Sequence, residues 1–259
     1  GLPIDNPESG YVGSGFSTAD EDRGTDWEVS SNGGHVTVAG TWNMYCHREP
    51  RFYLAVNFHN GWFCSEERRY DFFMNGKDNP HTHDAPQNGY LLRKKVSPES
   101  KVKEGLFKYR PGIICRLAEA YLNYAEALNE VDPGNPSILE YVNSVRSRAG
   151  VRQYSFGATD ENYIHVDKDQ AALREVIKAE RRVELCCEGL RYNDLRRWKE
   201  AEETLNGQFY GMNYNGTGDA FFQLTAYQTR VYKKAYYWFP IHQSELDKNE
   251  NLVQNPYWN

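Results

Sequence analysis

The chain has 259 residues, of which 25% are charged and 39% are apolar, and its formal net charge is −6. Such a length suffices for a substantial buried core. The negative charge argues against nucleic acid as the partner, because binding to phosphates requires an excess of clustered Lys and Arg. The sequence contains no apolar run near the roughly 20 residues that a membrane-spanning helix needs. Its five cysteines are odd in number and include no C-x-x-C pair, which argues against a disulfide framework and a zinc knuckle.

Residues 1–110 are rich in Gly, Pro, Asn, Asp and Ser, and aromatic residues are scattered through them. The stretch "SSNGGHVTVAGTW" (residues 30–42) predicts a turn and a short strand. The stretch "RFYLAVNFHNGWF" (residues 51–63) alternates enough to predict a second strand, with a turn at "HNG". We therefore expect residues 1–110 to be a loop-rich segment with short strands.

The next segment has a helical period. Apolar residues recur at positions 114, 117, 118, 121, 122, 125 and 128, which predicts an amphipathic helix that begins near Ile113 and stops at "DPG" (residues 132–134). A second helix is expected from Asn135 to Gly150, with Pro136 at the favoured first position. Two helices joined by a tight turn form an αα-hairpin, here similar in size to one tetratricopeptide unit (residues 111–150).

Further helices are expected downstream. One runs from Ala171 to Glu188, where Gly189 interrupts it, and another covers Asn193 to Leu205. Aromatic-rich irregular chain follows, and then a short helix over Ser244–Asp247. The sequence thus predicts a mainly α fold for residues 111–259.

The stretch "ERRVELCCEGLRYNDLRRW" (residues 180–198) holds nine charged residues. Its acidic and basic side chains interleave, which suits pairing on helix faces and not a polyanion-binding stripe. Three carboxylates, at Glu180, Glu184 and Glu188, share one face of the expected helix. Basic residues nearby (Arg181, Arg182 and Arg191) are expected to pair with them, and paired carboxylates keep low pKa values that do not suit a general acid. We interpret this segment as structural.

Other chemical signals are weak. Cys186 and Cys187 are expected to point about 100° apart on a helix, so they do not readily bond. The "HTHD" stretch (His81–Asp84) offers two histidines to a metal ion but lacks a third ligand at a telling spacing. The sequence contains none of the common catalytic or phosphate-binding motifs. It predicts no catalytic residue, no metal ligand and no cofactor.

The aromatic excess of the loop-rich segment has two interpretations. Aromatic residues carry much apolar area and usually form core. Loops on a rigid frame are also where binding residues tend to lie, and flat rings suit the apolar faces of sugars. The candidate ligand-binding residues on this second interpretation are Trp27, Trp42, Tyr45 and Trp62.

Six stretches, in order, resemble segments of the SusD/RagB family of outer-membrane nutrient-binding lipoproteins of Bacteroidota. They cover most of the chain: "NMYCHREPRFYLAVNFHNGWF", "NGYLLRKKV", "RLAEAYLNYAEALNE", "YVNSVRSRAGV", "IKAERRVELCCEGLRYNDLRRW" and "YYWFPIHQSELDKNENLVQNP". The resemblance is to the C-terminal part of the family, so we expect an N-terminal portion of the family fold to be absent from this chain.

The resemblance implies a SusD-like fold in which tetratricopeptide-type helix pairs support a loop-rich ligand-binding face. It implies a non-catalytic protein, lipid-anchored on the outer leaflet of the outer membrane, that binds glycans for a TonB-dependent SusC-type transporter. The anchor would lie in the absent N-terminal portion. Three alternatives stay open. They are peptide capture within the same family, a glycoside hydrolase, which would need two carboxylates about 5 to 10 Å apart at the sugar site, and a purely structural interaction scaffold, which would show no concave aromatic site.

Overall fold

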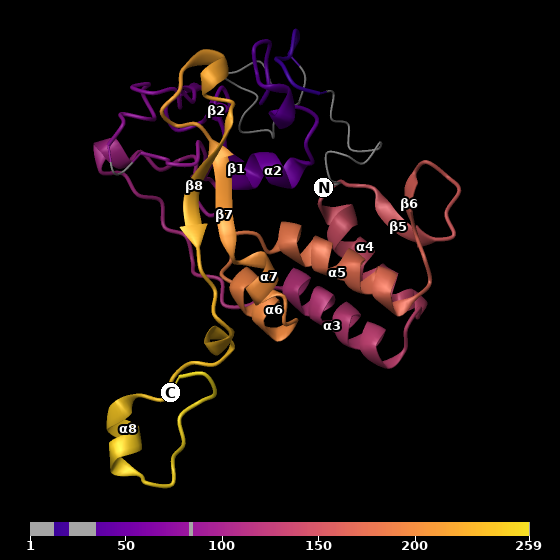
Figure 1. Ribbon diagram of the computed structural model, residues 1–259. Helices are drawn as coiled ribbons and strands as arrows, with labels where there is room; N and C mark the ends of the chain where they lie inside the picture. The colour runs from indigo at the N-terminus through magenta and orange to yellow at the C-terminus, as the bar shows by residue number, and fades with distance from the viewer. Residues whose placement is uncertain (1–12, 21–34, 83–84, 259) are drawn as a thin grey trace.

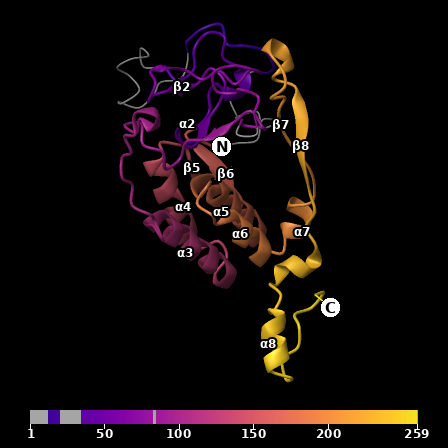
Figure 2. The same ribbon diagram turned by 90° about the vertical axis from the view of Figure 1, so that its left-hand side faces the viewer.

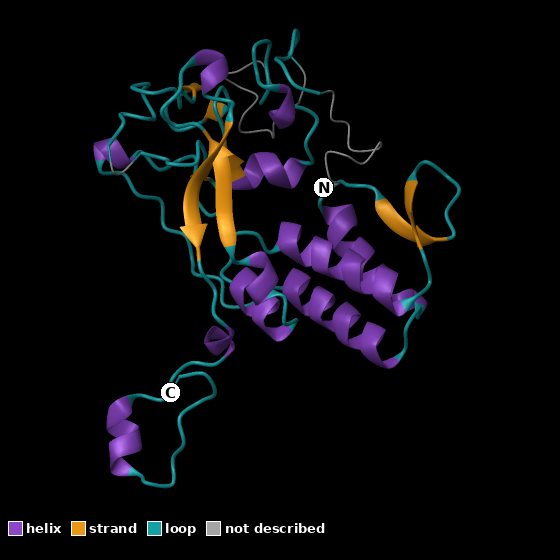
Figure 3. Cartoon of the chain, in the orientation of Figure 1, coloured by secondary structure: helices purple, strands orange, loops and turns teal. Residues whose placement is uncertain are grey.

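The computed structural model describes residues 13–20, 35–82 and 85–258. Helices α3 to α7 gather in one region, the loop-rich N-terminal chain lies beside them, and a long two-stranded hairpin runs between the two regions (Figures 1 and 3). The C-terminal helix α8 (Gln243–Lys248) projects away from both regions in two perpendicular views (Figures 1 and 2). The arrangement therefore separates a helical frame from a loop-rich end.

Helices α3 (Leu117–Val131) and α4 (Pro136–Arg148) form the expected hairpin. The side chain of Asn135 accepts a hydrogen bond from the Ser137 backbone N–H at 3.0 Å and so caps α4. The expected start of the first helix near Ile113 is wrong, because α3 begins at Leu117. The residue before it, Arg116, is extended (φ −139°), and its side chain reaches carboxylates near the end of α5.

Helix α5 (Gln170–Glu184) begins at Asp169, whose carboxylate accepts hydrogen bonds from two backbone N–H groups of the first turn. It ends at Glu184 and not at Glu188 as predicted. Cys187 has a φ of +61° in the turn that follows, so the two adjacent cysteines do not continue the helix. Their sulfur atoms are 3.4 Å apart, within hydrogen-bond distance, and both thiols are free.

The single helix expected over 193–205 is two helices, α6 (Arg191–Arg197) and α7 (Ala201–Thr204). Lys199 separates them with a φ of +63°. The α-helical core lies where α3 contacts α4 and α5. Its fully buried side chains are Leu122, Ala125, Ile138, Val142 and Leu173. From Ala118 onward the apolar period of the sequence matches the buried faces, whereas Ile114 and Leu117, which belong to the same period, are exposed.

The loop-rich end contains short elements. They are the 3-10 helices η1 (Asn43–Tyr45) and η2 (Val102–Glu104), helix α2 (Pro50–Ala55), and strands β1 (Val56–Asn57), β2 (Trp62–Phe63), β3 (Arg68–Arg69) and β4 (Leu91–Leu92). Strand β1 pairs with β4, and β2 with β3, both antiparallel.

Two strand predictions for this end need correction. The "RFYLA" part of the expected strand is helix α2, which Pro50 starts at the position where its missing N–H costs nothing. The described part of the expected strand at 30–42, residues 35–42, is not a continuous strand. Trp42 forms an isolated bridge with Phe16 there. The aromatic period in these stretches reflects a second core, which we call the aromatic core. Its buried residues are Val36, Tyr45, Tyr53, Phe58, Tyr70, Phe72, Met212, Phe221 and Phe222.

Sequence analysis missed the longest strands. Strand β7 (Gly207–Met212) pairs antiparallel with β8 (Leu224–Arg230), with a register shift between Phe209 and Tyr210. The loop between them contains the 3-10 helix η3 (Gly218–Ala220) and places Phe221 and Phe222 in the aromatic core. The 3-10 helix η4 (Lys234–Tyr237) follows. A second missed pair is parallel, β5 (Gln153–Phe156) with β6 (Tyr163–Val166).

Candidate functional site

A cavity of about 550 Å³ opens on the loop-rich end; we call it the aromatic cavity. Its walls come from three places: the end of α2, the β2–β3 turn, and the segment 93–99 that follows β4. Arg110 completes the lining. The lining includes Leu54, Trp62, Phe63, Tyr70, Arg93, Lys94, Lys95, Glu99 and Arg110.

Backbone and side-chain hydrogen bonds hold these walls together. The Ser65 hydroxyl donates to the carbonyl of Pro98 at 3.0 Å, which joins the β2–β3 turn to segment 93–99. The guanidinium of Arg93 donates to the carbonyl of Tyr53 at 2.7 Å and to the Cys64 sulfur at 3.6 Å. The cavity is therefore built on anchored loops, an arrangement that suits recognition of a ligand.

Three aromatic rings line the cavity. Phe63 stacks on Tyr70 with ring centroids 4.6 Å apart and an interplanar angle of 12°. Burial raises the pKa of the Tyr70 hydroxyl well above its usual range. Trp62 is 9% exposed, and the guanidinium carbon of Arg69 lies 5.2 Å from its ring centroid. The buried indole N–H of Trp62 has no hydrogen-bond partner among the described residues.

The four predicted binding residues do not form one site. Trp62 lines the aromatic cavity, whereas Trp42 and Tyr45 lie in the aromatic core. Trp42 is half-buried and stacks on Phe222, with centroids 4.6 Å apart. Tyr45 is 1% exposed, and burial raises its pKa. Trp27 lies outside the described residues. Among the three candidates that the structure describes, Trp42 is thus the one that is partly exposed and lies away from the cavity.

The lining includes residues that sequence analysis did not single out. Phe63 and Tyr70 belong to the aromatic excess of residues 1–110 but are not among the four candidates, and no sequence motif marks Arg110. The run Arg93-Lys94-Lys95 was a visible signal, because it places three cations directly after a short apolar stretch. Its significance depends on the turn at 62–65, which lies about 30 residues away and is joined to it only by the fold.

A second cavity, of about 260 Å³, adjoins the first; we call it the basic cavity. Leu54, Lys94, Lys95 and Arg110 line both cavities. The rest of the basic cavity is formed largely by charged residues. They are Arg51 of α2, Arg116 before α3, Arg148 of α4, Glu184 of α5 and Glu188 after α5.

An ion-pair network connects the basic cavity to the helical frame. Arg51 of α2 contacts Glu180 at 2.5 Å and Glu184 at 3.0 Å, and both carboxylates are 2–3% exposed. Arg116 contacts Glu184 at 2.6 Å and Glu188 at 2.7 Å. The prediction that residues 180–198 are structural fits these contacts, but the predicted partners of the three carboxylates are wrong. The carboxylates pair with residues distant in sequence.

The residues expected as partners have other contacts. Arg181 holds Asp194 through two hydrogen bonds, at 3.1 and 3.0 Å. The guanidinium carbon of Arg191 lies 6.0 Å from the centroid of the Trp198 ring. Burial is the main cause that lowers the pKa of Arg191, and the positive charge of Arg182 lowers it further. Lys94 instead contacts Glu188, at 2.6 Å. Burial alone would raise the pKa of Glu188, but Arg116 and Lys94 outweigh it and hold the pKa below its usual value.

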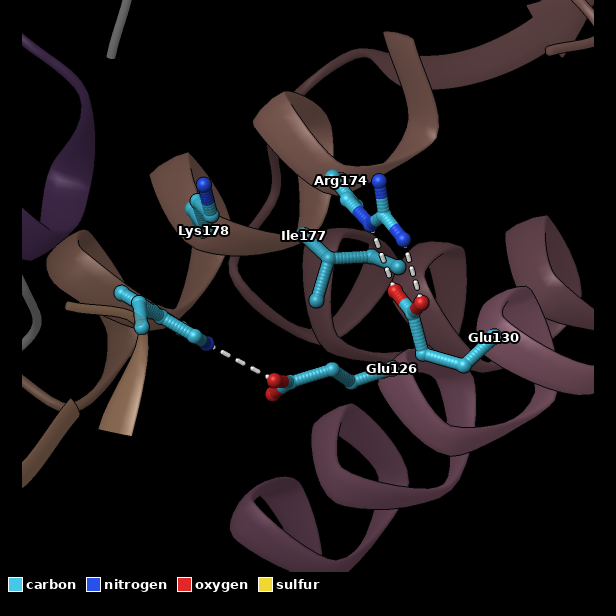
Figure 4. Close-up of a pocket in the computed structure, with 6 residues that line it drawn as sticks. Glu126, Glu130, Arg174, Ile177 and Lys178 are labelled. Atoms are coloured by element: carbon cyan, nitrogen blue, oxygen red, sulfur yellow. Dashed lines mark hydrogen bonds and ion pairs between the residues drawn. The ribbon is translucent and has the colours of Figure 1, made fainter. Parts of the chain in front are cut away.

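A third cavity, of about 260 Å³, lies between α3 and α5 (Figure 4). It contains two carboxylates, the feature that a glycosidase would need. Glu130 contacts Arg174 at 2.5 Å, and that hydrogen bond lowers its pKa. Burial would raise the pKa of Glu126, but hydrogen bonds from Arg197 and Trp198 outweigh it and lower the pKa. Neither carboxyl in this cavity is poised as a general acid.

Among the described residues, no group of three or more His, Cys, Asp or Glu side chains is arranged to hold a metal ion. In the "HTHD" stretch, the His81 imidazole contacts the Asn215 side chain at 2.6 Å, and residues 83 and 84 lie outside the described ranges. No helix in the described part of the chain is both long and apolar enough to cross a membrane.

The order of these elements and the sequence that forms them match a known protein family. The profile of the SusD family matches residues 14–258. The chain belongs to the SusD family. The resemblance seen in the six sequence stretches is thereby confirmed, and so is the mainly α, SusD-like fold.

Related SusD proteins come from Bacteroidota. SusD-like protein P2 of Formosa agariphila is 31% identical over 144 residues, which are 54% of this chain and 24% of that protein. A SusD-like protein of Bacteroides fragilis has a similar structure, with a TM-score of 0.66 and 28% identity over 83% of this chain and 40% of that one. A SusD-like carbohydrate-binding protein of the same species gives a TM-score of 0.61 and 26% identity, over 80% and 42% of the two chains. The chain thus spans less than half of these relatives.

Proposed function

We propose that this SusD protein is a non-catalytic binder of glycans at the bacterial cell surface. The observation that carries the proposal is the family match over residues 14–258, supported by a structural relative described as carbohydrate-binding. The aromatic cavity is our proposed ligand site. Phe63, which is half-buried, and Leu54, which is 41% exposed, supply apolar surface for a sugar, and the polar groups around them supply hydrogen bonds.

The rest of the cellular role follows from the family resemblance. We place the protein on the outer leaflet of the outer membrane, held by a lipid anchor. There it passes glycans to a TonB-dependent SusC-type transporter. The tetratricopeptide-type packing of α3 and α4 would form the rigid frame for the ligand-binding end.

Trp42 is a second proposed contact, because it is half-buried and its ring lies in the aromatic core near the surface. Trp27 stays a candidate on sequence grounds alone. Tyr45 is a weaker candidate than its sequence position indicates, since a ring that is 1% exposed offers no face to a sugar.

The experiment uses the full-length protein on a glycan array and a peptide array, together with a hydrolysis assay on every glycan that binds. The proposal expects saturable binding to one class of glycan, and recovery of that glycan uncleaved. Binding to peptides alone would establish the alternative of peptide capture. Release of shorter sugars by the pure protein would establish a glycoside hydrolase. A Glu126→Gln/Glu130→Gln variant then tests whether the third cavity is responsible.

A further inference from the structure

The two adjoining cavities are basic in a chain that is acidic overall. Seven basic side chains line them (Arg51, Arg93, Lys94, Lys95, Arg110, Arg116, Arg148), against three carboxylates (Glu99, Glu184, Glu188). The chain as a whole carries a net charge of −6. A concave surface of one sign focuses its field and attracts ligands of the opposite sign.

Most of these cations are already neutralised within the protein. Glu184 is contacted by Arg51, Arg116 and Arg148, the last at 2.5 Å. Glu188 is contacted by Arg116 and Lys94. These cations are paired with carboxylates of the protein, so their charge does not by itself indicate a ligand site.

Lys95 and Arg110 differ from the other cations. Within the described ranges, neither has an ion pair with a carboxylate or a hydrogen bond, and both are exposed. Glu99, the carboxylate that lines the aromatic cavity with them, pairs instead with Lys108 at 2.7 Å. Lys108 is accordingly the main cause of the lowered pKa of Glu99, to which Arg110 adds a smaller effect. Two cations without a carboxylate partner thus stand where the two cavities meet.

The surfaces beside these cations are apolar. Leu54, which is 41% exposed, lines both cavities, and Phe63 and Trp62 line the aromatic one. A ligand that filled both cavities would therefore meet an aromatic and aliphatic wall and, next to it, two accessible positive charges. Sugar rings that carry anionic groups have both of the matching features.

We propose that the joined cavities bind a saccharide that carries sulfate or carboxylate groups. The sugar rings pack in the aromatic cavity, and the anionic groups pair with Lys95 and Arg110. Charge-assisted hydrogen bonds to sulfate or carboxylate oxygens are stronger than those to neutral hydroxyls. This inference rests on the proposed glycan-binding function and adds the chemical class of the glycan.

The test compares two charge-matched variants of the full-length protein. One is Lys95→Gln/Arg110→Gln. The control is Arg182→Gln/Lys233→Gln, which removes two exposed cations that line neither cavity. Both are titrated against the strongest binders from an array of sulfated, uronate-containing and neutral oligosaccharides, at about 50 mM and about 500 mM NaCl.

The inference predicts that the strongest binders are anionic. Their affinity should fall about tenfold or more in the cavity variant but less than twofold in the control. High salt should weaken the wild type more than the cavity variant, because salt screens the two removed charges. Desulfating a binder, or reducing its carboxyl groups, tells which anionic group is recognised.

Contrary results separate the two proposals. If the strongest binders are neutral, the inference is overturned while the glycan-binding function stands. If anionic binders are held equally well by the cavity variant and the control, the cavities are not the site. If no glycan binds and peptides do, the proposed function fails as well. Circular dichroism and a melting curve on each variant ensure that lost affinity is not lost fold.

Discussion

Trp62 shows how one residue can belong to the core and to a binding surface. Its ring is 91% buried yet lines the largest of the cavities described above. Replacement with Ala should lower the free energy of unfolding by about 3 to 5 kcal/mol, as for other large aromatics removed from a core. The measurement is urea denaturation, with Tyr109→Ala as the control, because Tyr109 is 85% exposed. A Trp62→Ala protein that is as stable as the control would mean that the ring serves only as a ligand platform.

His59 is a candidate cause of acid destabilisation. Its ring stacks on Phe73 at 3.9 Å, and its Nδ1 accepts the Phe72 backbone N–H at 3.0 Å. Burial lowers its pKa, although Asp71 and Asp78 oppose the shift. The unfolded chain protonates His59 near pH 6.5, whereas the folded chain protonates it at a lower pH. The stabilisation that depends on neutral His59 is therefore complete above about pH 6.5. It is lost as the pH falls below that value.

The variant His59→Gln removes the titrating group and keeps an acceptor for the Phe72 N–H. Its free energy of unfolding should decline less than that of the wild type between pH 7.5 and 5.5. The control is His165→Gln, an exposed histidine that contacts Asp167. If His59→Gln and the wild type lose stability in parallel, another group is responsible.

Composition indicated which residue types matter at this end of the molecule, but not which face each ring presents. The pairing of Trp42 with Phe222 joins residues 180 positions apart, so no local pattern contains it. The sequence could therefore supply a list of aromatic candidates, and the fold was needed to separate Tyr45 from Trp62.

At the scale of elements, helix α5 connects the helical frame to the loop-rich end. Its Glu184 accepts charge-assisted hydrogen bonds from Arg51, Arg116 and Arg148, which lie on three different segments. Replacement by Gln leaves these cations without their carboxylate and should cost about 3 to 5 kcal/mol. Glu175→Gln is the control, since that side chain is 77% exposed and forms an i,i+3 ion pair with Lys178 at 3.2 Å.

Thermal or urea unfolding of both variants provides the measurement. Arg191→Ala should also cost less than Glu184→Gln, although sequence analysis paired the two residues. A loss for Glu184→Gln no larger than that for Glu175→Gln would show that the network contributes nothing net.

Elements with a strong helical period were predictable, and their ends were not. The start of α3 is set by Arg116, which leaves the helix to reach α5, and the end of α5 is set by the turn at Cys187. Both are tertiary effects that override local propensity. The hairpin β7–β8 was missed because its residues alternate weakly and most of β8 is exposed on both faces.

At the scale of the whole molecule, large apolar side chains lie on the surface. Ile114 is fully exposed, Phe107 is 73% exposed, and Val253 in the C-terminal segment is 80% exposed. Extended exposed apolar surface promotes association. We predict that these 259 residues, expressed alone, self-associate, and that Phe107→Lys/Ile114→Lys raises the monomer fraction in light scattering. A wild-type 259-residue chain that is monomeric and unfolds cooperatively would contradict this prediction.

The central claim is that the joined cavities of a SusD protein hold a glycan. Hydrogen–deuterium exchange of the full-length protein, with and without a saturating glycan identified on the array, tests it most directly. The account predicts slower exchange in segments 62–65 and 93–99 when the glycan is bound. It predicts no change around the third cavity, in residues 126–130 of α3 and 174–178 of α5 (Figure 4). Protection confined to these two stretches, or to other segments that line neither joined cavity, would contradict it.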